Sequence, residues 1–275
     1  MPETTLQPET RPIDCPRHSP CIDLSYVDAG SGPAVVLIHG LGGHAAGWEQ
    51  QIQALAGAYR VIAPELRGHG GSGYRAEEAV TLRSFTEDLV TLLKDLGVEA
   101  AHVCGNSMGG LLALELWVRY PALVKSLILA DTTAFFPPPH ILHDFLRFFD
   151  QMEMLAWASF MAPRLLRPGT AADLIRQVVE TMAATTREVY QQGLVATFSA
   201  DYRWALPLID VPTLIVVGEE DQATPRGYAR FLEHHIKDAV LRVVPEAAHL
   251  PQQENPGEFN RVVQEHLERV GGKRS

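Results

Sequence analysis

Short apolar runs alternate with helix-like segments through residues 21–132, and this alternation restricts the fold more than any other feature. The runs have the length and composition of buried strands, whereas the segments between them, such as 45–57 and 82–97, have helical length and spacing. Strands that alternate with helices build a parallel sheet covered by helices on both faces. The sequence therefore predicts an α/β fold with a mostly parallel central sheet.

The alternation stops after residue 132 and resumes near residue 207. Prolines open the segment between these points, and its apolar residues, including Phe148 and Met152, recur at helical spacing. This pattern predicts a mostly helical cap inserted into the sheet-containing core. We predict an extended or disordered leader at 1–20 and a helical cap at 133–206. The core consists of two parts, 21–132 and 207–270.

The sequence Gly-Asn-Ser-Met-Gly at 105–109 lies where an apolar, strand-like run meets a leucine-rich run of helical length. Because Gly105 and Gly109 lack a Cβ, strand and helix can approach closely and hold Ser107 in a strained turn with its hydroxyl exposed. The same pattern arises by chance in ordinary glycine-rich turns. The strand–turn–helix context favours Ser107 as a nucleophile.

A serine nucleophile needs a base that removes its proton and an acid that fixes the tautomer of the base. In folds of this kind both follow the serine, the acid first and the histidine second, each after a later strand. Asp221 lies in the loop after the strand-like run 212–218, and His249 follows the run 239–244. We therefore predict the triad Ser107, Asp221 and His249.

Asp131 is the main rival for the acid, since it also ends a strand-like run, and Glu219 and Glu220 are weaker alternatives. The chain has eleven histidines, and most histidines in proteins are structural. His39 and His69 each adjoin glycines, and we expect them to shape their loops.

The loop His-Gly-Leu-Gly-Gly at 39–43 follows a strand-like run and is flexible enough to aim backbone N–H groups at a ligand. We predict that Leu41 and Met108 supply the N–H groups of an oxyanion hole, the second at a helix N-terminus that favours negative charge. This loop matches neither glycine-rich phosphate motif, which argues against nucleotide binding. No cofactor and no metal are predicted.

Five blocks in this order resemble the α/β-hydrolase family: HGLGG, IAPELRGHGGS, GNSMGG, GEEDQATP and AAHLPQQENPGEF. The resemblance spans about residues 21–270. Within the family the chain looks most like the 3-oxoadipate enol-lactonases and small carboxylesterases, through VIAPELRGHG and DYRWALPLIDVPTLIVVGEEDQATP. Asn106 departs from that group and is similar to the meta-cleavage-product hydrolases, which split carbon–carbon bonds. Those enzymes usually carry tryptophan after the catalytic histidine, where this chain has Leu250.

The resemblance implies a small-molecule acyl ester or lactone as substrate, cleaved through an acyl-enzyme. Asn106, Trp157 and Trp204 are the predicted substrate contacts. A substrate with a carboxylate would also need a cation in the cavity. The cap arginines that could supply it are Arg147, Arg164, Arg167, Arg176, Arg187 and Arg203. Carbon–carbon bond hydrolysis and a non-catalytic ligand receptor on the same fold remain the alternatives.

Composition is consistent with an enzyme that needs no disulfides. With 275 residues, 46% of them hydrophobic, the chain can bury a large core, and its three cysteines suggest no disulfide framework. A formal net charge of −10 argues against nucleic acid as a partner. We expect no membrane span and no signal peptide, and therefore a cytoplasmic protein. The sequence makes no prediction about oligomeric state.

Overall fold

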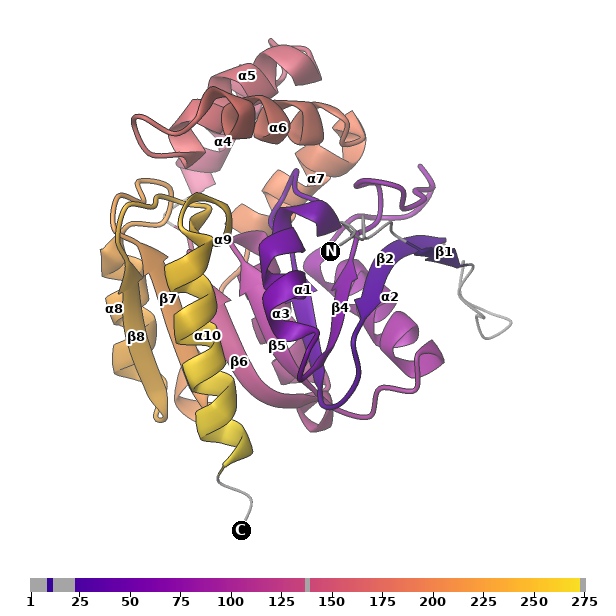
Figure 1. The fold of residues 1–275 in the computed structure, drawn as a ribbon. Coiled ribbons are helices and arrows are strands. Elements are labelled where there is room, and N and C mark those ends of the chain that lie inside the picture. Colours follow the sequence, from indigo (N-terminus) through magenta and orange to yellow (C-terminus); the bar gives the residue numbers. More distant parts are fainter. Residues whose placement is uncertain (1–8, 12–22, 137–138, 273–275) are drawn as a thin grey trace.

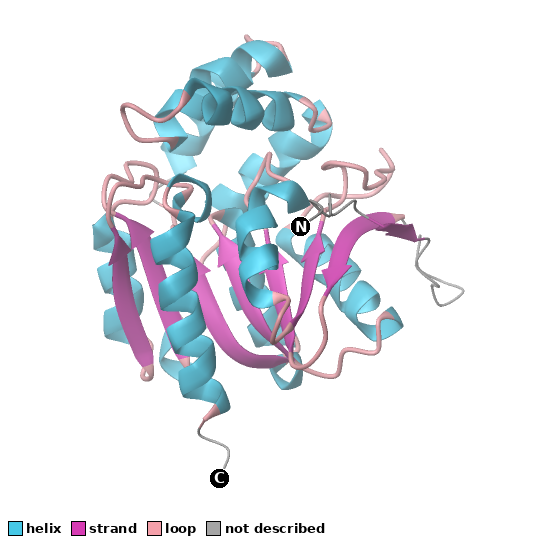
Figure 2. Ribbon diagram, viewed as in Figure 1, coloured by secondary structure: helices cyan, strands magenta, loops and turns pink. Residues whose placement is uncertain are grey.

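An eight-stranded sheet runs through the middle of the protein, as Figure 1 and Figure 2 show. The computed structural model describes residues 9–11, 23–136 and 139–272. The strands are β1 (Glu9–Arg11), β2 (Leu24–Ala29), β3 (Ala34–Ile38), β4 (Arg60–Pro64), β5 (Ala101–Asn106), β6 (Val124–Ala130), β7 (Thr213–Gly218) and β8 (Ala239–Val244). Their order in the sheet is β1-β2-β4-β3-β5-β6-β7-β8. Strands β3 to β8 pair in parallel, whereas β1 and β2 form antiparallel pairs.

Helices cover both faces of the sheet. The helices of the core are α1 (Glu49–Leu55) and α10 (Pro256–Gly271) on one face, and α2 (Leu82–Asp95), α3 (Met108–Arg119) and α8 (Arg226–His235) on the other. Short helical turns are η1 (Ala45–Trp48), η2 (Pro121–Leu123), η3 (Leu206–Leu208) and α9 (Pro251–Glu254). The predicted α/β fold with a mostly parallel sheet is therefore confirmed.

Strand β3 shows why the apolar runs read as buried strands. Its side chains alternate between the faces, so Val35 and Leu37 pack in the core under α1 and α10, whereas Val36 and Ile38 pack under α2 and α3. A strand covered on both sides needs apolar residues at every position. The run is therefore apolar at every position because helices cover both faces of the strand.

A helical cap lies over the edge at which the parallel strands end (Figure 1). The cap helices are α4 (Pro139–Phe149), α5 (Met154–Leu165), α6 (Ala172–Ala183) and α7 (Arg187–Phe198). They pack around their own apolar cluster, which includes Phe149, Trp157 and Met182. The expected helical insertion is present, and it closes the space above the strand ends.

Within the predicted leader, residues 9–11 form β1, and its other residues lie outside the described part of the chain, as do two of the three prolines at 137–139. In the described ranges no helix combines the length and the apolar character that crossing a membrane requires.

Candidate active site

Ser107 occupies the turn between β5 and α3 in a conformation that few residues other than glycine adopt, with φ 55° and ψ −119°. The neighbouring glycines make this turn possible. A Cβ on Gly105 would lie 2.1 Å from the carbonyl oxygen of Gly109, and one on Gly109 would lie 2.2 Å from that of Ile38. Strand and helix therefore pack backbone against backbone, as the motif predicts, and the serine is placed at the end of the strand.

Asp221 and His249 are in direct contact. The Nδ1 atom of His249 lies 3.0 Å from Oδ2 of Asp221, and both side chains are buried. Thr224 donates its hydroxyl to the same Oδ2 at 2.6 Å, and the backbone N–H groups of Ala223 and Thr224 donate to Oδ1 at 2.8 and 3.1 Å. Burial would raise the pKa of Asp221, but the charge and hydrogen bond of His249 and the Thr224 bonds outweigh it and hold that pKa well below its ordinary value.

Two backbone contacts hold His249 from either side. The amide of Asn106 donates to the carbonyl oxygen of His249 at 3.0 Å, and the N–H of His249 donates to the carbonyl oxygen of Leu165 in the cap at 3.0 Å. Ser107 and His249 line one cavity. The Ser107 hydroxyl has no hydrogen-bond partner among the described residues, His249 included. Such bonds often form only when substrate is present.

The other acids considered from the sequence lie elsewhere or make other contacts. Glu219 pairs with Arg226 at 3.1 Å, and Glu220 lies 3.8 Å from Arg167. Asp131, by contrast, is buried beside Asp221 and His249, and each of the three offers an atom within 4.8 Å of the other two. Such a trio could in principle ligate a metal, although Asp221 and His249 are already bonded to each other. Of the four acids, Asp221 makes the hydrogen bond to His249.

The loop at 39–43 is shaped by two buried histidines. Gly42 donates its N–H to Nε2 of His69 at 3.1 Å, and Nε2 of His39 accepts from the N–H of Leu66 at 3.0 Å. Burial lowers the pKa of His69 to about 4 and also lowers that of His39. Both rings therefore stay neutral near pH 7 and can accept these bonds. Leu41 and Met108 line the cavity, and the Met108 N–H begins α3, with no carbonyl behind it in the same helix.

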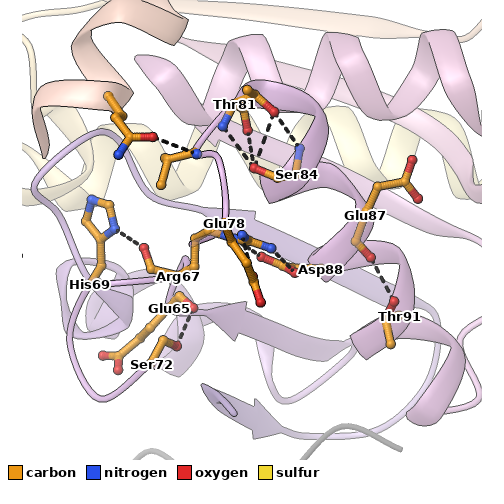
Figure 3. A network of polar contacts seen from close by, with 12 residues as sticks. Glu65, Arg67, His69, Ser72, Glu78, Thr81, Ser84, Glu87, Asp88 and Thr91 are labelled. Atoms are coloured by element: carbon orange, nitrogen blue, oxygen red, sulfur yellow. Dashed lines mark hydrogen bonds and ion pairs between the residues drawn. The ribbon is translucent and has the colours of Figure 1, made fainter. Parts of the chain in front are cut away.

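His69 is in turn held by the loop that follows β4, as Figure 3 shows. Its Nδ1 lies 3.0 Å from the carbonyl oxygen of Arg67, and the guanidinium of Arg67 forms a buried pair of bonds to Asp88 at 2.6 and 2.7 Å and one to Glu78 at 3.0 Å. The sequence reasoning did not anticipate the link from His69 to Gly42. A Gly-x-Gly-x-x-Gly pattern does occur at 68–73, outside the 39–43 loop, but it opens no helix and its Gly70 packs against the Glu65 carboxylate, which disfavours phosphate.

A cavity of about 1140 Å³ lies between the strand ends and the cap. Its floor contains Leu41, Asn106, Ser107, Met108 and His249, and its roof contains Phe145, Phe160, Met161, Met182 and Leu194. We use the names floor and roof for these two sets. The five roof residues are apolar, and the cap also contributes polar residues to the lining of the cavity, namely Arg164, Gln177, Glu180, Thr181 and Thr197.

The two tryptophans predicted to contact substrate do not line this cavity. Trp157 is fully buried inside the cap, where its ring lies 5.1 Å from that of Phe145 and 5.0 Å from that of Phe149. Trp204 is 60% exposed on the surface. The structure thus places neither tryptophan at the cavity. For Trp157, helical periodicity does not distinguish the face of a cap helix that packs on its neighbours from the one that faces a cavity, and Trp204 lies in a turn after α7. Asn106 does line the cavity, with its amide turned to His249.

Among the cap arginines in the described part of the chain, Arg164 is the one that lines the cavity. Its guanidinium lies 3.5 Å from the centre of the Phe160 ring and donates to the Phe160 carbonyl oxygen. The side chain is solvent-exposed, which places it at the mouth. Arg187 donates to the carbonyl oxygens of Met152 and Phe149. Other arginines pair with acids: Arg167 with Glu220 and Glu246, Arg176 with Asp173, and Arg203 with Asp201.

One carboxylate connects the cap to the loop that carries His249. Glu254 accepts through Oε1 from the N–H of Arg167 and the hydroxyl of Thr170, each at 2.8 Å, and through Oε2 from the N–H of Ala248 at 2.7 Å. Together with the bond from His249 to Leu165, these contacts fix one end of the cap to the loop that carries His249. Nothing in the sequence pattern marked Glu254 for this role.

The fold and this constellation define a family. Residues 35–262 match the alpha/beta hydrolase family, and the chain belongs to it. The chain is 29% identical over 258 residues to 3-oxoadipate enol-lactonase 2 of Acinetobacter baylyi, covering 90% of this chain and 94% of that one. It is 28% identical to the pimeloyl-[acyl-carrier protein] methyl ester esterase of Nitrosospira multiformis, covering 85% and 94%.

Solved structures give the same result. A thermophilic esterase from Thermogutta terrifontis, described with malate bound, has a TM-score of 0.89 and 27% identity, with 95% of this chain and 99% of that one covered. The enol-lactonase from Burkholderia xenovorans LB400 has a TM-score of 0.82 and 28% identity, with coverage of 90% and 96%. The resemblance inferred from the five sequence blocks is confirmed, and so is the prediction of a hydrolase.

Proposed function

We propose that the protein hydrolyses a carboxylic ester or lactone through an acyl-enzyme formed on Ser107. The observation that carries the proposal is the bond between His249 and Asp221 at the floor of a cavity that also exposes the strained turn of Ser107. Lactonases and esterases among the relatives support the same reaction class.

In the first half of the reaction, Ser107 Oγ attacks the substrate carbonyl while His249 Nε2 takes its proton. Asp221 accepts from Nδ1, which holds the imidazole in the required tautomer and stabilises its cation. The carbonyl oxygen becomes an oxyanion within reach of the Leu41 and Met108 N–H groups. Such donors typically contribute about 10²–10³ in rate each. His249 then protonates the leaving alkoxide or enolate.

In the second half, water takes the place of the leaving group and His249 removes its proton. The resulting hydroxide attacks the acyl carbonyl, and Ser107 leaves with the proton returned by His249. For a lactone the leaving group stays attached to the acid product. The same residues therefore serve esters and lactones, and the roof decides which substrates fit.

Substrate selection follows from the contrast between the apolar roof and the cation at the mouth. Phe145, Phe160 and Met182 favour an apolar acyl or alcohol part. Arg164 favours a substrate whose free carboxylate reaches the mouth, and it acts against the carboxylates of Glu49, Glu180 and Glu220, which line the same cavity. An exposed arginine gives a modest preference, because water screens its charge. A carboxylate-bearing ester or lactone is the substrate class we infer.

The proposal is tested with chromogenic esters, lactones and dienoates, and by labelling with a fluorophosphonate. Wild type should turn over esters or lactones and carry the label on Ser107, while Ser107→Ala should do neither. The control is the folded state of the variant, measured by circular dichroism. Preferential turnover of dienoates would favour carbon–carbon bond hydrolysis, and absence of both label and turnover would favour a receptor.

A further inference from the structure

A second carboxylic acid is buried against the acid of the triad. Asp131 follows β6 and Asp221 follows the neighbouring β7, so the parallel register brings both to the same edge of the sheet. Their side chains are 1% and 3% exposed, and an atom of each lies within 4.8 Å of the other. The mechanism above uses Asp221 and gives Asp131 no part.

The hydrogen-bond partners of the two acids differ sharply. Asp221 accepts two backbone N–H groups, the Thr224 hydroxyl and His249. Asp131 accepts one bond through Oδ1, from the N–H of Gly218 at 2.7 Å, and its buried Oδ2 has no partner among the described residues. Two ionised carboxylates this close in a buried site would repel each other strongly. A proton on one of them removes the repulsion and supplies a donor.

The surroundings place that proton on Asp131. Burial raises the pKa of Asp131 well above its ordinary value, and the charges of Asp221 and Glu254 add to this, against the opposing bond from Gly218. The backbone holds the residue in place, because its N–H donates to the carbonyl oxygen of Val216 at 2.9 Å and its φ is 43°. This left-handed conformation is unusual for residues other than glycine and is kept only where the surroundings enforce it.

We propose that Asp131 is held as a neutral carboxylic acid whose Oδ2–H donates to the Asp221 carboxylate, which makes Asp131 a positioning residue for the acid of the triad. The inference rests on the proposed role of Asp221. The donated hydrogen bond orients the Asp221 carboxylate toward His249 Nδ1. It also leaves a single negative charge beside the imidazole, so the base is not held in its protonated form.

The variant Asp131→Asn distinguishes whether Asp131 is neutral or ionised in the wild-type protein. Asparagine keeps the shape, an acceptor for Gly218 and a donor for Asp221. We expect kcat to change by less than about threefold and the acid limb of kcat/KM to stay at the same pH. If Asp131 were ionised, its removal would take a negative charge from beside His249 and shift the acid limb down by about one pH unit or more. That shift would overturn the proposal.

Asp131→Ala removes the donor and should lower kcat about tenfold or more, with KM little changed and activity recovered in Asp131→Asn. Equal activity in the alanine variant and wild type would overturn the positioning role. Because the alanine variant also leaves the Gly218 N–H unpaired, its folding is checked by circular dichroism before its kinetics are compared. If it does not fold, the asparagine variant and the spectroscopic test below decide.

Infrared difference spectroscopy tests the proton directly, without turnover. The difference between wild type and Asp131→Asn near pH 7 should contain the carbonyl stretch of a protonated carboxylic acid, which shifts in D₂O. The difference between wild type and the surface variant Glu219→Gln should lack it. Absence of the band from the Asp131 difference would overturn the proposal. If the band is present but the protein hydrolyses no ester, the protonated state of Asp131 would be supported and the proposed function would be overturned.

Discussion

The floor of the cavity is held by hydrogen bonds, whereas its roof is held by the packing of aromatic and methionine side chains. On the floor, Asn106 donates to the carbonyl oxygen of His249; behind it, Thr224 donates to Asp221 and His69 accepts from the N–H of Gly42, the residue after Leu41. In the cap, the roof ring of Phe145 and the ring of Phe149 behind the roof pack against Trp157. Directional bonds fix atoms closely, while apolar packing fixes volume and tolerates changes of shape. We therefore expect substitutions in the floor to affect kcat, and substitutions in the roof to affect stability and substrate choice.

The largest effect should come from the floor. Asp221→Asn should lower kcat by about 10⁴, because the amide stabilises the wrong tautomer of His249. Stopped assays on a p-nitrophenyl ester measure the loss. Asp131→Asn is the matched control, since it changes a neighbouring acid in the same way, and it should remain close to wild type. A loss of activity in Asp131→Asn, with Asp221→Asn close to wild type, would assign the role of the triad acid to Asp131.

Trp157→Ala tests the packing behind the roof. Removal of this buried ring should lower the free energy of unfolding by about 3–5 kcal/mol, because it leaves a cavity inside the cap. Urea denaturation followed by circular dichroism measures the change, and the folded variant should keep kcat within a few-fold of wild type. Trp204→Ala, at an exposed site, should stay within about 0.5 kcal/mol. A large rise in KM without destabilisation would place Trp157 in the substrate site after all.

The pH dependence of stability tests whether His69, behind the loop at 39–43, is held neutral. The pKa of His69 is about 4 in the folded protein and about 6.5 in the unfolded chain. The unfolded state therefore binds this proton first, and the contribution of His69 to stability falls as pH decreases from about 6.5 to about 4. The fall amounts to about 1.4 kcal/mol per pH unit. The destabilisation caused by His69→Gln should shrink over this range, and a constant difference between the two proteins would contradict it.

His69→Ala tests how far the oxyanion loop depends on its support. Without the acceptor at Nε2, the N–H of Gly42 loses its partner and the Leu41 peptide is free to turn. We expect kcat to fall about 10- to 100-fold. This is less than the fall expected when both donors of an oxyanion hole are removed. Steady-state kinetics on a short acyl ester measure the change. A rise in KM alone would assign His69 to substrate binding instead.

The smallest effect should come from Arg164→Met at the mouth. This change should remove a several-fold preference for esters with a free carboxylate, and should leave neutral esters of the same size unaffected. The ratio of kcat/KM for a matched anionic and neutral pair is the measurement. Arg176→Met, on the exposed side of the cap, serves as the control. An unchanged ratio in Arg164→Met would indicate a neutral, apolar substrate.

The sequence predicted features that depend on local spacing. The turn of Ser107 and the strands before Asp221 and His249 follow from runs and glycines within a few residues of one another. The contact between Asp131 and Asp221 depends on which strands are neighbours. Both residues follow strand-like runs, and this position was a sign that they could lie close together. From the sequence alone it identified them only as alternative candidates for the acid of the triad.

The roof was less accessible to sequence reasoning. Trp157 has the character of a cavity wall, yet it fills the interior of the cap, and Trp204, in a turn after α7, lies on the surface. An apolar residue on an amphipathic helix is buried against something, and the spacing alone does not say against what. Glu254 was missed for a related reason, because its partners Arg167 and Ala248 come from two separate parts of the chain.

Glu254 has a mechanical consequence. Because one carboxylate accepts from both the segment after α5 and the loop of His249, the two segments are tied to each other at this corner of the cap. A substitution that removes the carboxylate would therefore leave the N–H groups of Arg167 and Ala248 without their acceptor at the same time, so the junction of cap and core and the loop of the proposed base depend on one side chain.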